Sequence, residues 1–399
     1  MNTESSQGKA QRAIAGLQQY FGHLRDRRQQ AKTDYPLLTI IAVVLLGTLA
    51  GCDGWDELAA WAELHASKLR SFLDLGARGE TPCETTLARV LARLEPNAFR
   101  DAFMAWAKAL NQARREQNDD GSSPACSIAI DGKALRRALK RAGATSPMML
   151  VSAFATDNHL VLGAVRTEDK SNEITAIPAL LDLLDLEGAL VTIDAAGTQT
   201  NNTDKIVAKK ADYVLALKGN QGSTHLAVGQ FLLDAEQEGF ESTKHREWST
   251  EEDGHGRHER RRVVAVEPPS DLLRDERWLG LKSIVYVERE RAVGTSALSI
   301  ERHFYLSSLR YTEVRRIATA IRAHWSIENN LHWVLDTQFR EDENQIGEGF
   351  APENLAMLRR FALNCLKQRR DVKGSMKWKA KRCFADFDFL IDTLLRGLP

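Results

Sequence analysis

Apolar residues recur at helical spacing through about the first 120 positions of the chain. The longest apolar run, residues 37–50, has fourteen residues, which is short of the ~20 that a membrane-spanning helix needs. A polar stretch precedes it, which a signal peptide does not have, so we expect a buried core helix that Pro36 begins and Gly51 ends. Residues 1–34 are polar and basic, with a frayed start expected. Further helical patterns cover residues 55–64, 69–75, 84–94 and 97–115, so residues 1–120 predict a small helical domain.

The pattern changes after a linker at residues 118–124, which is rich in Asn, Asp, Gly and Ser. Short apolar runs then predict three strands, a helix, a strand, a helix and a fifth strand. Their ranges are 127–131, 149–156, 160–167, 175–185, 189–194, 203–210 and 213–217. Two hairpin connections followed by right-handed crossovers place the strands in the order 3-2-1-4-5. This is the order of an RNase H-like mixed α/β sheet, and residues 121–221 would form its first part.

Residues 222–303 interrupt this pattern and predict a β-rich insertion, with strand-like runs at 262–266, 283–287 and 298–305. A long helix follows from Tyr311 to about Phe339, with further helices at 352–369 and 387–395. We assign residues 304–370 to the second part of the RNase H-like core and residues 371–399 to a basic C-terminal tail.

Two aspartates stand at the ends of strands that this order makes neighbours. Asp131 closes the first predicted strand and Asp194 closes the fourth. Adjacent strands lie about 4.8 Å apart, so the two carboxylates would repel each other unless a cation lay between them. An aspartate after a strand can also simply begin a turn, but two on adjacent strands favour a site for Mg²⁺ or Mn²⁺.

The long helix supplies a candidate third ligand, Glu328. Its predicted apolar stripe contains residues Val314, Ile317, Ala318, Ile321, Trp325, Leu331 and Leu335. Glu328 falls on that stripe, where a carboxylate is costly unless it is paired or bound to metal. The alternative is an ion pair with Arg322 or His332. We interpret the three acids near the helix end, Asp336, Glu341 and Asp342, as solvated.

Histidines flank Glu328 at four-residue spacing, at His324 and His332. The array is not the HExxH pattern of zinc proteases, and no cysteine or further histidine is placed to complete a zinc site. Both histidines can support the acids, contact DNA or serve a purely structural role. Basic residues beside the acids could bind phosphate, or could be solvated charges; they are Lys133, Arg136, Arg137, Lys140, Arg141 and Lys218. Gln221, which ends the run that begins at Lys218, and Arg322 on the long helix are further candidate DNA contacts.

Overall charge gives little support to nucleic-acid binding, because 54 basic side chains balance 54 acidic ones. Local charge differs: residues 1–32 carry six Lys/Arg and two acids, and residues 355–399 carry eleven Lys/Arg and four acids. Both ends could therefore contact phosphates. The five cysteines form no CxxC pair, which excludes a zinc ribbon and indicates a reducing compartment.

The chain resembles the H-repeat-associated, ISAs-type DDE transposases of bacterial insertion sequences over roughly residues 15–370. The matching motifs are residues 35–38 (YPLL), 54–57 (GWDE), 130–133 (IDGK), 170–178 (KSNEITAIP), 192–195 (TIDA), 212–221 (DYVLALKGNQ), 324–336 (HWSIENNLHWVLD), 339–342 (FRED) and 354–356 (NLA). The resemblance implies a helical DDE-associated domain, an RNase H-like core, and a triad of Asp131, Asp194 and Glu328.

Two motifs depart from the pattern. Residues 194–199 read DAAGTQ where relatives usually show DAMGCQ. The wider superfamily often has Tyr, Arg and Lys around its glutamate, where this chain has Ile321, His324 and Leu335. The roles assigned to those three residues, in phosphate contact and base flipping, therefore do not carry over.

The mechanism that we infer is two-metal phosphoryl transfer, with the triad holding two Mg²⁺ or Mn²⁺ ions. Water cuts DNA at the element end, and the freed 3′-OH attacks target DNA. The expected partners are the terminal inverted repeats and target DNA, with a homodimer in the synaptic complex and no membrane. The expected location is the bacterial cytoplasm, with the nucleoid. The alternatives are an RNase H-like nuclease without strand transfer and an inactive or domesticated copy that only binds DNA.

Overall fold

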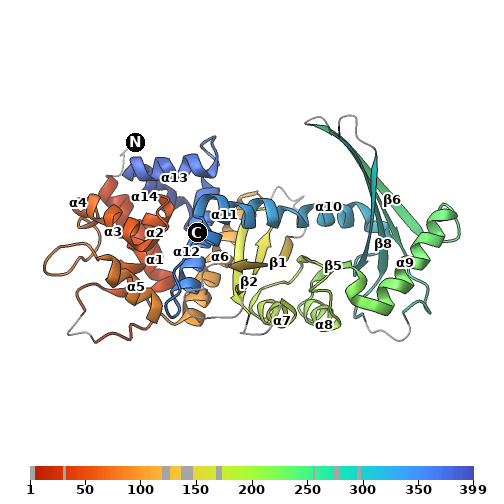
Figure 1. Ribbon diagram of the computed structural model, residues 1–399, viewed down its shortest axis with the longest axis horizontal. Coiled ribbons are helices and arrows are strands. Elements are labelled where there is room, and N and C mark those ends of the chain that lie inside the picture. Colours follow the sequence, from red (N-terminus) through yellow and green to blue (C-terminus); the bar gives the residue numbers. More distant parts are fainter. Residues whose placement is uncertain are drawn as a thin grey trace.

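Helices from both ends of the chain form one body at one end of the molecule (Figure 1). The computed structural model describes residues 5–29, 33–118, 126–135, 147–167, 173–254, 257–273, 278–293 and 298–399. The N-terminal helices of this body are α1 (Ser6–Phe21), α2 (Leu37–Leu49), α3 (Trp55–Leu64), α4 (Ala66–Leu69), α5 (Glu84–Arg93) and α6 (Pro96–Asn118). The helical domain predicted from the sequence is present, with two differences: α1 forms where a frayed segment was expected, and residues 70–75 of the helix predicted at 69–75 are not helical, because the short α4 ends at Leu69.

The long apolar segment is a core helix, as predicted. Residues 39–49 of α2 are all buried, and the helix packs against α12 (Ala351–Gln368), α3 and α1. Among the residues described, no helix is both long and apolar enough to cross a membrane.

The residues that we assigned to a basic tail are folded. They form α13 (Met376–Ala385) and α14 (Phe387–Arg396), and α14 packs against α1. The indole of Trp106 donates a hydrogen bond to the carbonyl of Gly397 at 3.0 Å, so the chain end is part of the core. Five of the basic side chains that we counted after residue 355 are buried, namely Arg359, Arg360, Lys367, Arg369 and Lys379. The basic C-terminal region, residues 355–399, therefore exposes fewer charges than its sequence indicates, although only Lys379 of the buried set lies in the predicted tail itself.

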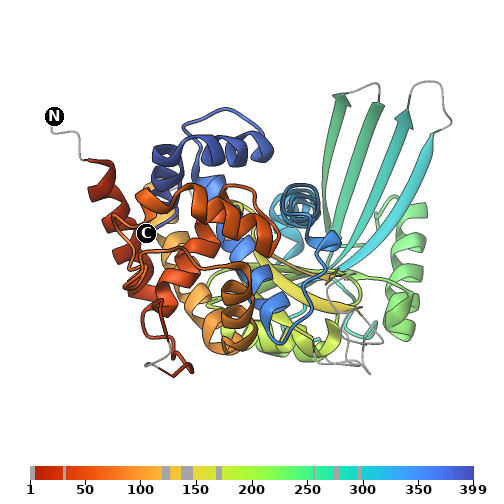
Figure 2. The ribbon, with the colours of Figure 1, turned by 60° about the vertical axis from the view of Figure 1, so that its left-hand side comes forward.

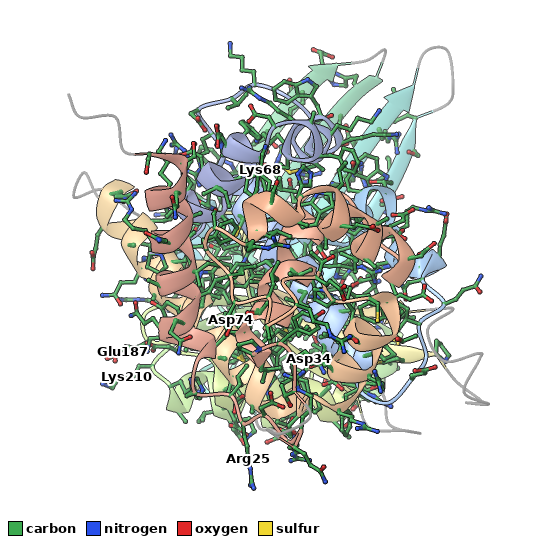
Figure 3. All side chains as sticks on the ribbon, turned by 90° about the vertical axis from the view of Figure 1, so that its left-hand side faces the viewer. Arg25, Asp34, Lys68, Asp74, Glu187 and Lys210 are labelled. Atoms are coloured by element: carbon green, nitrogen blue, oxygen red, sulfur yellow. The ribbon has the colours of Figure 1, made fainter. Side chains whose placement is uncertain are left out.

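Exposed charges of both signs lie on the outer side of the helical body. Figure 3 labels Arg25 and Lys68 on the same view as Asp34 and Asp74, and all four side chains are exposed. This face is therefore not a uniformly basic surface for a polyanion.

A mixed sheet of nine strands runs through the rest of the described chain, which confirms the mixed α/β class. The strands are β1 (Ser127–Leu135), β2 (Met148–Ala155), β3 (Leu160–Arg166), β4 (Leu190–Ile193), β5 (Asp212–Leu217), β6 (His245–Gly254), β7 (Arg257–Val266), β8 (Ser283–Val293) and β9 (Ser299–Ser307). Their order is β3-β2-β1-β4-β5-β9-β8-β7-β6. The predicted order 3-2-1-4-5 holds for the first five strands, but the whole sheet differs because four more strands extend it.

The extension comes from the predicted insertion, which starts with a helix that the sequence analysis missed, α9 (Gly222–Gln237). Strand β9 pairs antiparallel with β5, so the insertion continues the central sheet instead of forming a separate layer. Its distal strand ends project on the side of the molecule where α10 (Val314–His324) lies (Figures 1 and 2). Helix α10 contacts β1, β4, β5, β6 and β7, and thus spans the junction between the two halves of the sheet.

Helices cover both faces of the central strands. The helices α7 (Glu173–Leu183) and α8 (Thr200–Ala208) lie on one side, and α10 with α11 (Trp333–Phe339) lies on the other (Figure 2). Between α10 and α11 the chain makes a π-helical turn, Glu328–His332. Short 3₁₀ turns at Gly219–Gln221, Tyr311–Glu313 and Glu341–Glu343 complete the elements. The predicted long helix is thus interrupted after His324, where α10 ends, and again by the π-helical turn from Glu328 to His332.

Candidate active site

The three predicted acids line a single pocket of about 290 Å³ between the central sheet, α10 and the sheet extension. Asp131 comes from β1, Asp194 follows β4, and Glu328 begins the π-helical turn. Segments almost 200 positions apart in the sequence therefore contribute carboxylates to one space. The pocket also contains residues Thr192, Ala195, Lys218, Arg261, Arg289, His303, Tyr305, Ile321, Arg322, His324 and Trp325.

The two aspartates follow aligned positions on adjacent parallel strands. Ile130 of β1 pairs with Ile193 of β4, and each aspartate is the next residue. Asp194 ends its strand as predicted, but Asp131 lies in the middle of β1, which continues to Leu135 because it pairs with β2 over that length. The strand order nevertheless brings the two backbones together, as the sequence analysis expected.

Glu328 does not lie on the apolar stripe where we placed it. Trp325 is 61% exposed and the side chain of Glu328 is 54% exposed, whereas Ile327 is fully buried. The straight helix that we assumed is interrupted twice, by the end of α10 at His324 and by the π-helical turn that begins at Glu328, so an ideal 3.6-residue period fails beyond His324. Glu328 faces the open pocket, where water or a cation can solvate it.

His332 lies between two of the acids and is buried. Its Nδ1 is 3.6 Å from Oδ2 of Asp131 and 3.7 Å from Oε2 of Glu328. Ligand atoms of these three residues all lie within 4.8 Å of one another, close enough to hold one cation. The hydrogen bond and charge of His332 lower the pKa of Glu328. If the acids only repelled one another, the pKa of Glu328 would be raised instead.

His324 supports the second aspartate's strand. Its Nδ1 lies 2.9 Å from the hydroxyl of Thr192, which precedes Asp194 by two residues on β4. Burial lowers the pKa of His324 to about 4, although the charges of Asp194 and Glu328 oppose this shift. The imidazole is therefore neutral at neutral pH and connects α10 to β4 through a hydrogen bond.

Lys133, which we predicted to contact DNA, is buried instead. Its ammonium is 2.6 Å from Oδ1 of Asp336 and donates to Oδ1 of Asp342 at 3.1 Å. This geometry does not suit a phosphate contact. Neither Asp336 nor Asp342 is a free solvated acid, and Glu341 is 1% exposed with an ion pair to the buried Arg360 at 2.9 Å. Our interpretation of these three acids as solvated was wrong, because β1 and α12 supply the cations.

The other predicted DNA contacts have different surroundings. Lys218 is exposed at the end of β5 and lines the pocket. Gln221 is turned inward, where its amide donates to the carbonyls of Ala195 at 3.1 Å and Thr198 at 2.7 Å. It therefore holds the loop that follows Asp194.

Arg322 also lines the pocket, and its guanidinium donates to Glu252 of β6 at 2.6 Å, which attaches α10 to the sheet extension. Arg136, together with Arg137, Lys140 and Arg141, lies outside the described residues.

The sheet extension supplies pocket residues that the sequence analysis did not identify. Arg261 and Arg289 line the pocket and both pair with Glu259 of β7, with contacts of 2.5 and 3.0 Å. His303 and Tyr305 of β9 lie beside them. The charge alternation of β7 and β8 was visible in the sequence, but nothing in it indicated that these strands join β5 and reach the acids.

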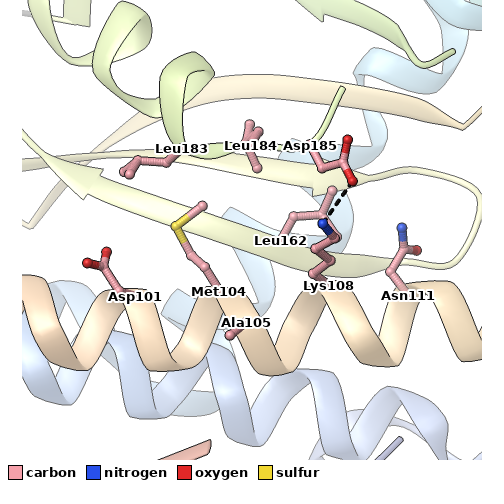
Figure 4. Close-up of a pocket in the computed structure, with 9 residues that line it drawn as sticks. All are labelled: Asp101, Met104, Ala105, Lys108, Asn111, Leu162, Leu183, Leu184 and Asp185. Carbon is pink, nitrogen blue, oxygen red and sulfur yellow. Dashed lines mark ion pairs between the residues drawn. The ribbon is translucent and has the colours of Figure 1, made fainter. Parts of the chain in front are cut away.

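A second cavity of about 250 Å³ lies between α6 and β3, near the end of α7 (Figure 4). An ion pair of 2.9 Å between Lys108 and Asp185 crosses it, and Met104, Leu162 and Leu183 supply apolar walls. Lys108, the cation drawn in Figure 4, is already paired with the carboxylate of Asp185, so this cavity does not resemble the pocket that holds the three acids.

Comparison with known proteins identifies the class. Residues 122–365 match the family described as "Transposase DDE domain", and residues 18–107 match the family described as "DDE_Tnp_1-associated". The first match covers more than half of the chain. The chain therefore belongs to the DDE transposase family, whose members are enzymes that act on DNA.

Relatives narrow the assignment within that family. The chain is 37% identical over 374 residues to a protein named "Putative transposase YncI" from Escherichia coli O157:H7, covering 93% of this chain and 92% of the relative. It is 31% identical over 382 residues to "H repeat-associated putative transposase YhhI" from Escherichia coli K12, covering 95% and 97%. This places the chain among the H-repeat-associated transposases.

A piggyBac transposase synaptic complex with hairpin DNA aligns with a TM-score of 0.40 at 9% identity, over 99% of this chain and 82% of that one.

Proposed function

We propose that Asp131, Asp194 and Glu328 are the metal-binding triad of an RNase H-like core that cuts DNA at insertion-sequence ends and joins them to target DNA. The observation that carries this proposal is their convergence on one pocket from two aligned strands and a helical turn. The strand order from β3 to β5 supports the RNase H-like assignment.

The residues present fit a hard divalent cation. The pocket offers three carboxylates, and two of them approach each other and His332 within 4.8 Å. Oxygen-rich donor sets favour Mg²⁺ or Mn²⁺ over softer ions, and two ions suit phosphoryl transfer. Two bound cations would supply Lewis-acid activation of the attacking oxygen and charge neutralisation at the leaving oxygen.

The chain's own residues orient this site. Hydrogen bonds from Gln221 hold the loop after Asp194, and the His324–Thr192 contact aligns α10 with β4. Lys218, which is exposed at the pocket, is positioned to attract a phosphate of the bound strand. Because the triad contacts only the DNA backbone, recognition of the terminal repeats must come from other surfaces.

A second surface for DNA, apart from the pocket, is the outer face of α13. This helix carries four basic residues and no acid, and Lys377 and Lys381 are exposed on it beside Trp378, which is 42% exposed. It contacts α11, the helix that follows the π-helical turn, and lies on the same side of the central sheet as α10 (Figure 2). We assign this face to the DNA backbone. A homodimer would pair two such chains on the two element ends.

The decisive experiment incubates the purified chain with Mn²⁺ and DNA that carries the inverted repeats flanking its gene. Cleavage at the repeat end and covalent joining of the 3′ end to a second DNA support the proposal. Cleavage without joining would make the protein a nuclease of this fold. Binding without cleavage, under conditions where an active relative cuts, would make it a DNA-binding copy.

A further inference from the structure

A buried lysine lies directly behind the π-helical turn. Lys367 is on α12, and its side chain is only 9% exposed. Its ammonium donates a hydrogen bond of 2.6 Å to the backbone carbonyl of Asn330, in the middle of the turn. On another side it lies 4.8 Å from the ring centroid of Phe154 on β2.

This is a costly place for a cation. Burial lowers the pKa of Lys367 to about 7, and no charged neighbour contributes to that shift. Within the described part of the chain, a carbonyl and an aromatic ring take the place of the carboxylate that usually compensates a buried ammonium. A lysine kept under these conditions indicates a requirement for a donor at the Asn330 carbonyl.

The turn that Lys367 contacts has an unusual geometry with a direct consequence for the site. A π-helical turn places hydrogen bonds five residues apart and adds one residue to the helix, and such turns are rare without outside support. One added residue rotates the rest of the helix by about 100° relative to a regular α-helix. The turn begins at Glu328 and ends at His332, the two residues that lie against Asp131.

We infer that Lys367 is a positioning residue: its hydrogen bond to Asn330 holds the π-helical turn in the form that places Glu328 and His332 against Asp131. The inference rests on the proposed metal triad and adds a residue that lies just beyond the matched Transposase DDE domain, which ends at 365. The ammonium of Lys367 donates to the Asn330 carbonyl and lies over the Phe154 ring, so its effect on the metal would pass through the backbone of the turn.

The test is Mn²⁺ binding to the full chain without DNA, measured by titration calorimetry or by the electron paramagnetic resonance of free Mn²⁺. Lys367→Met removes the donor and keeps the length of the side chain. We expect its Mn²⁺ dissociation constant to rise by about 10- to 100-fold, as when residues that orient metal ligands are lost. Lys367→Arg keeps a donor and should recover most of that affinity.

Lys379→Met is the matched control. Lys379 is also buried, at 6% exposure, and its ammonium also donates to a backbone carbonyl, that of Leu366 at 3.4 Å, which belongs to α12 and not to the turn. This variant should lose comparable thermal stability while its Mn²⁺ affinity stays within about twofold of wild type. Loss of a buried lysine alone would affect both variants alike, whereas loss of positioning affects only Lys367→Met.

A folded Lys367→Met that binds Mn²⁺ as tightly as wild type overturns the inference. If Lys367→Met does not fold, Lys367→Gln and Lys367→Arg decide, because the shorter glutamine cannot reach the carbonyl as lysine does. Equal Mn²⁺ affinity in those two variants overturns the inference as well. Failure of wild type itself to bind Mn²⁺ would instead reject the proposed triad, so the two failures are distinguishable.

Discussion

The ammonium of Lys133 lies 2.6 Å from the carboxylate of Asp336, and this ion pair joins β1 to α11. Lys133 follows Asp131 by two residues, so both side chains leave the same face of the strand. Asp336 follows His332 by four residues and therefore shares its side of the helix. One contact thus connects the strand that carries the first acid to the helix that continues from the third.

Lys133→Met should destabilise the protein strongly. Lys133 is 7% exposed, and its loss removes the cation that pairs with both Asp336 and Asp342. Breaking a buried pair from one side costs about 3–5 kcal/mol, and we expect about 2–4 kcal/mol in the free energy of unfolding because Asp336 is 34% exposed. Urea denaturation measures this loss of free energy of unfolding.

The surface pair Lys205–Asp182 is the control, and Lys205→Met should cost less than about 1 kcal/mol. Equal losses of unfolding free energy in the two variants would contradict a stabilising, buried ion pair at Lys133.

His324 should make the protein sensitive to mild acid. Its pKa is about 4 in the folded chain, below the ordinary value of 6.5. Between these two values the unfolded chain binds a proton that the folded chain does not, so stability falls as the pH drops from 6.5 towards 4. At about 1.4 kcal/mol for each pH unit between 6.5 and 4, the upper limit of this effect is about 3.5 kcal/mol.

His324→Gln removes this titration and retains a polar side chain opposite Thr192. Its melting temperature should change less than that of wild type when the pH is lowered from 7 to 4.5. The exposed His258 is the control site: Asp253 raises its pKa, so His258 adds stability as the pH falls, and His258→Gln should not make the protein less sensitive to acid. A His324→Gln profile parallel to wild type would contradict a neutral, buried His324.

The central strand order followed from the sequence because hairpins and crossovers leave few ways to connect five short strands. Asp194 could be placed for the same reason, since β4 is short and ends in a turn. Asp131 was identified correctly as a pocket residue but not as a mid-strand residue. The pairing of β1 with β2 extends to Leu135, and that pairing partner is not visible in the β1 sequence.

Glu328 was selected for a reason that the structure corrects. A 3.6-residue stripe placed it on the core side, whereas the π-helical turn places it in an open pocket. Hydrophobic periodicity cannot reveal one inserted residue when the residues around it are Asn329 and Asn330. The burial of Lys133 and Lys367, the two cations that support the site, could not be predicted either, because burial of a lysine depends on strands and helices far away in sequence.

Binding of duplex DNA should depend on α13. Lys377→Ala with Lys381→Ala removes two exposed cations from a helix without acids. Each lost phosphate contact reduces the slope of log K against log salt by about 0.9, so the double variant should lose about 1.8 from that slope. Glu328→Gln serves as the parent protein for these measurements, so that DNA remains uncut during titration.

The control for α13 replaces two exposed lysines elsewhere, Lys108 and Lys210, each of which pairs with an acid at the surface. That double variant should keep the parent slope. An α13 variant with an unchanged slope would remove this helix from the DNA-binding surface, while leaving the catalytic pocket unaffected.

Divalent metal should raise the melting temperature, and the acids should share that effect. A ligand that binds only the folded state stabilises it by about 2.7 kcal/mol at 100 times its dissociation constant. Wild type in excess Mn²⁺ should therefore melt a few degrees higher, and Asp131→Asn, Asp194→Asn and Glu328→Gln should each gain less. The variant Asp182→Asn changes a surface acid and should gain as much as wild type.

The same variants should differ from one another without metal, which tests the geometry around His332. Asp194 lies outside the compact group of Asp131, Glu328 and His332, so Asp194→Asn removes one negative charge from the pocket without loss of a contact to His332 and should melt no lower than wild type. Glu328→Gln also loses the favourable contact with His332 that lowers the pKa of Glu328. Because Glu328 is 54% exposed, that loss should be within about 1 kcal/mol. Calorimetry with and without Mn²⁺ measures both effects. If Mn²⁺ raised the melting temperature equally in wild type and all three variants, the acids would not bind one metal centre.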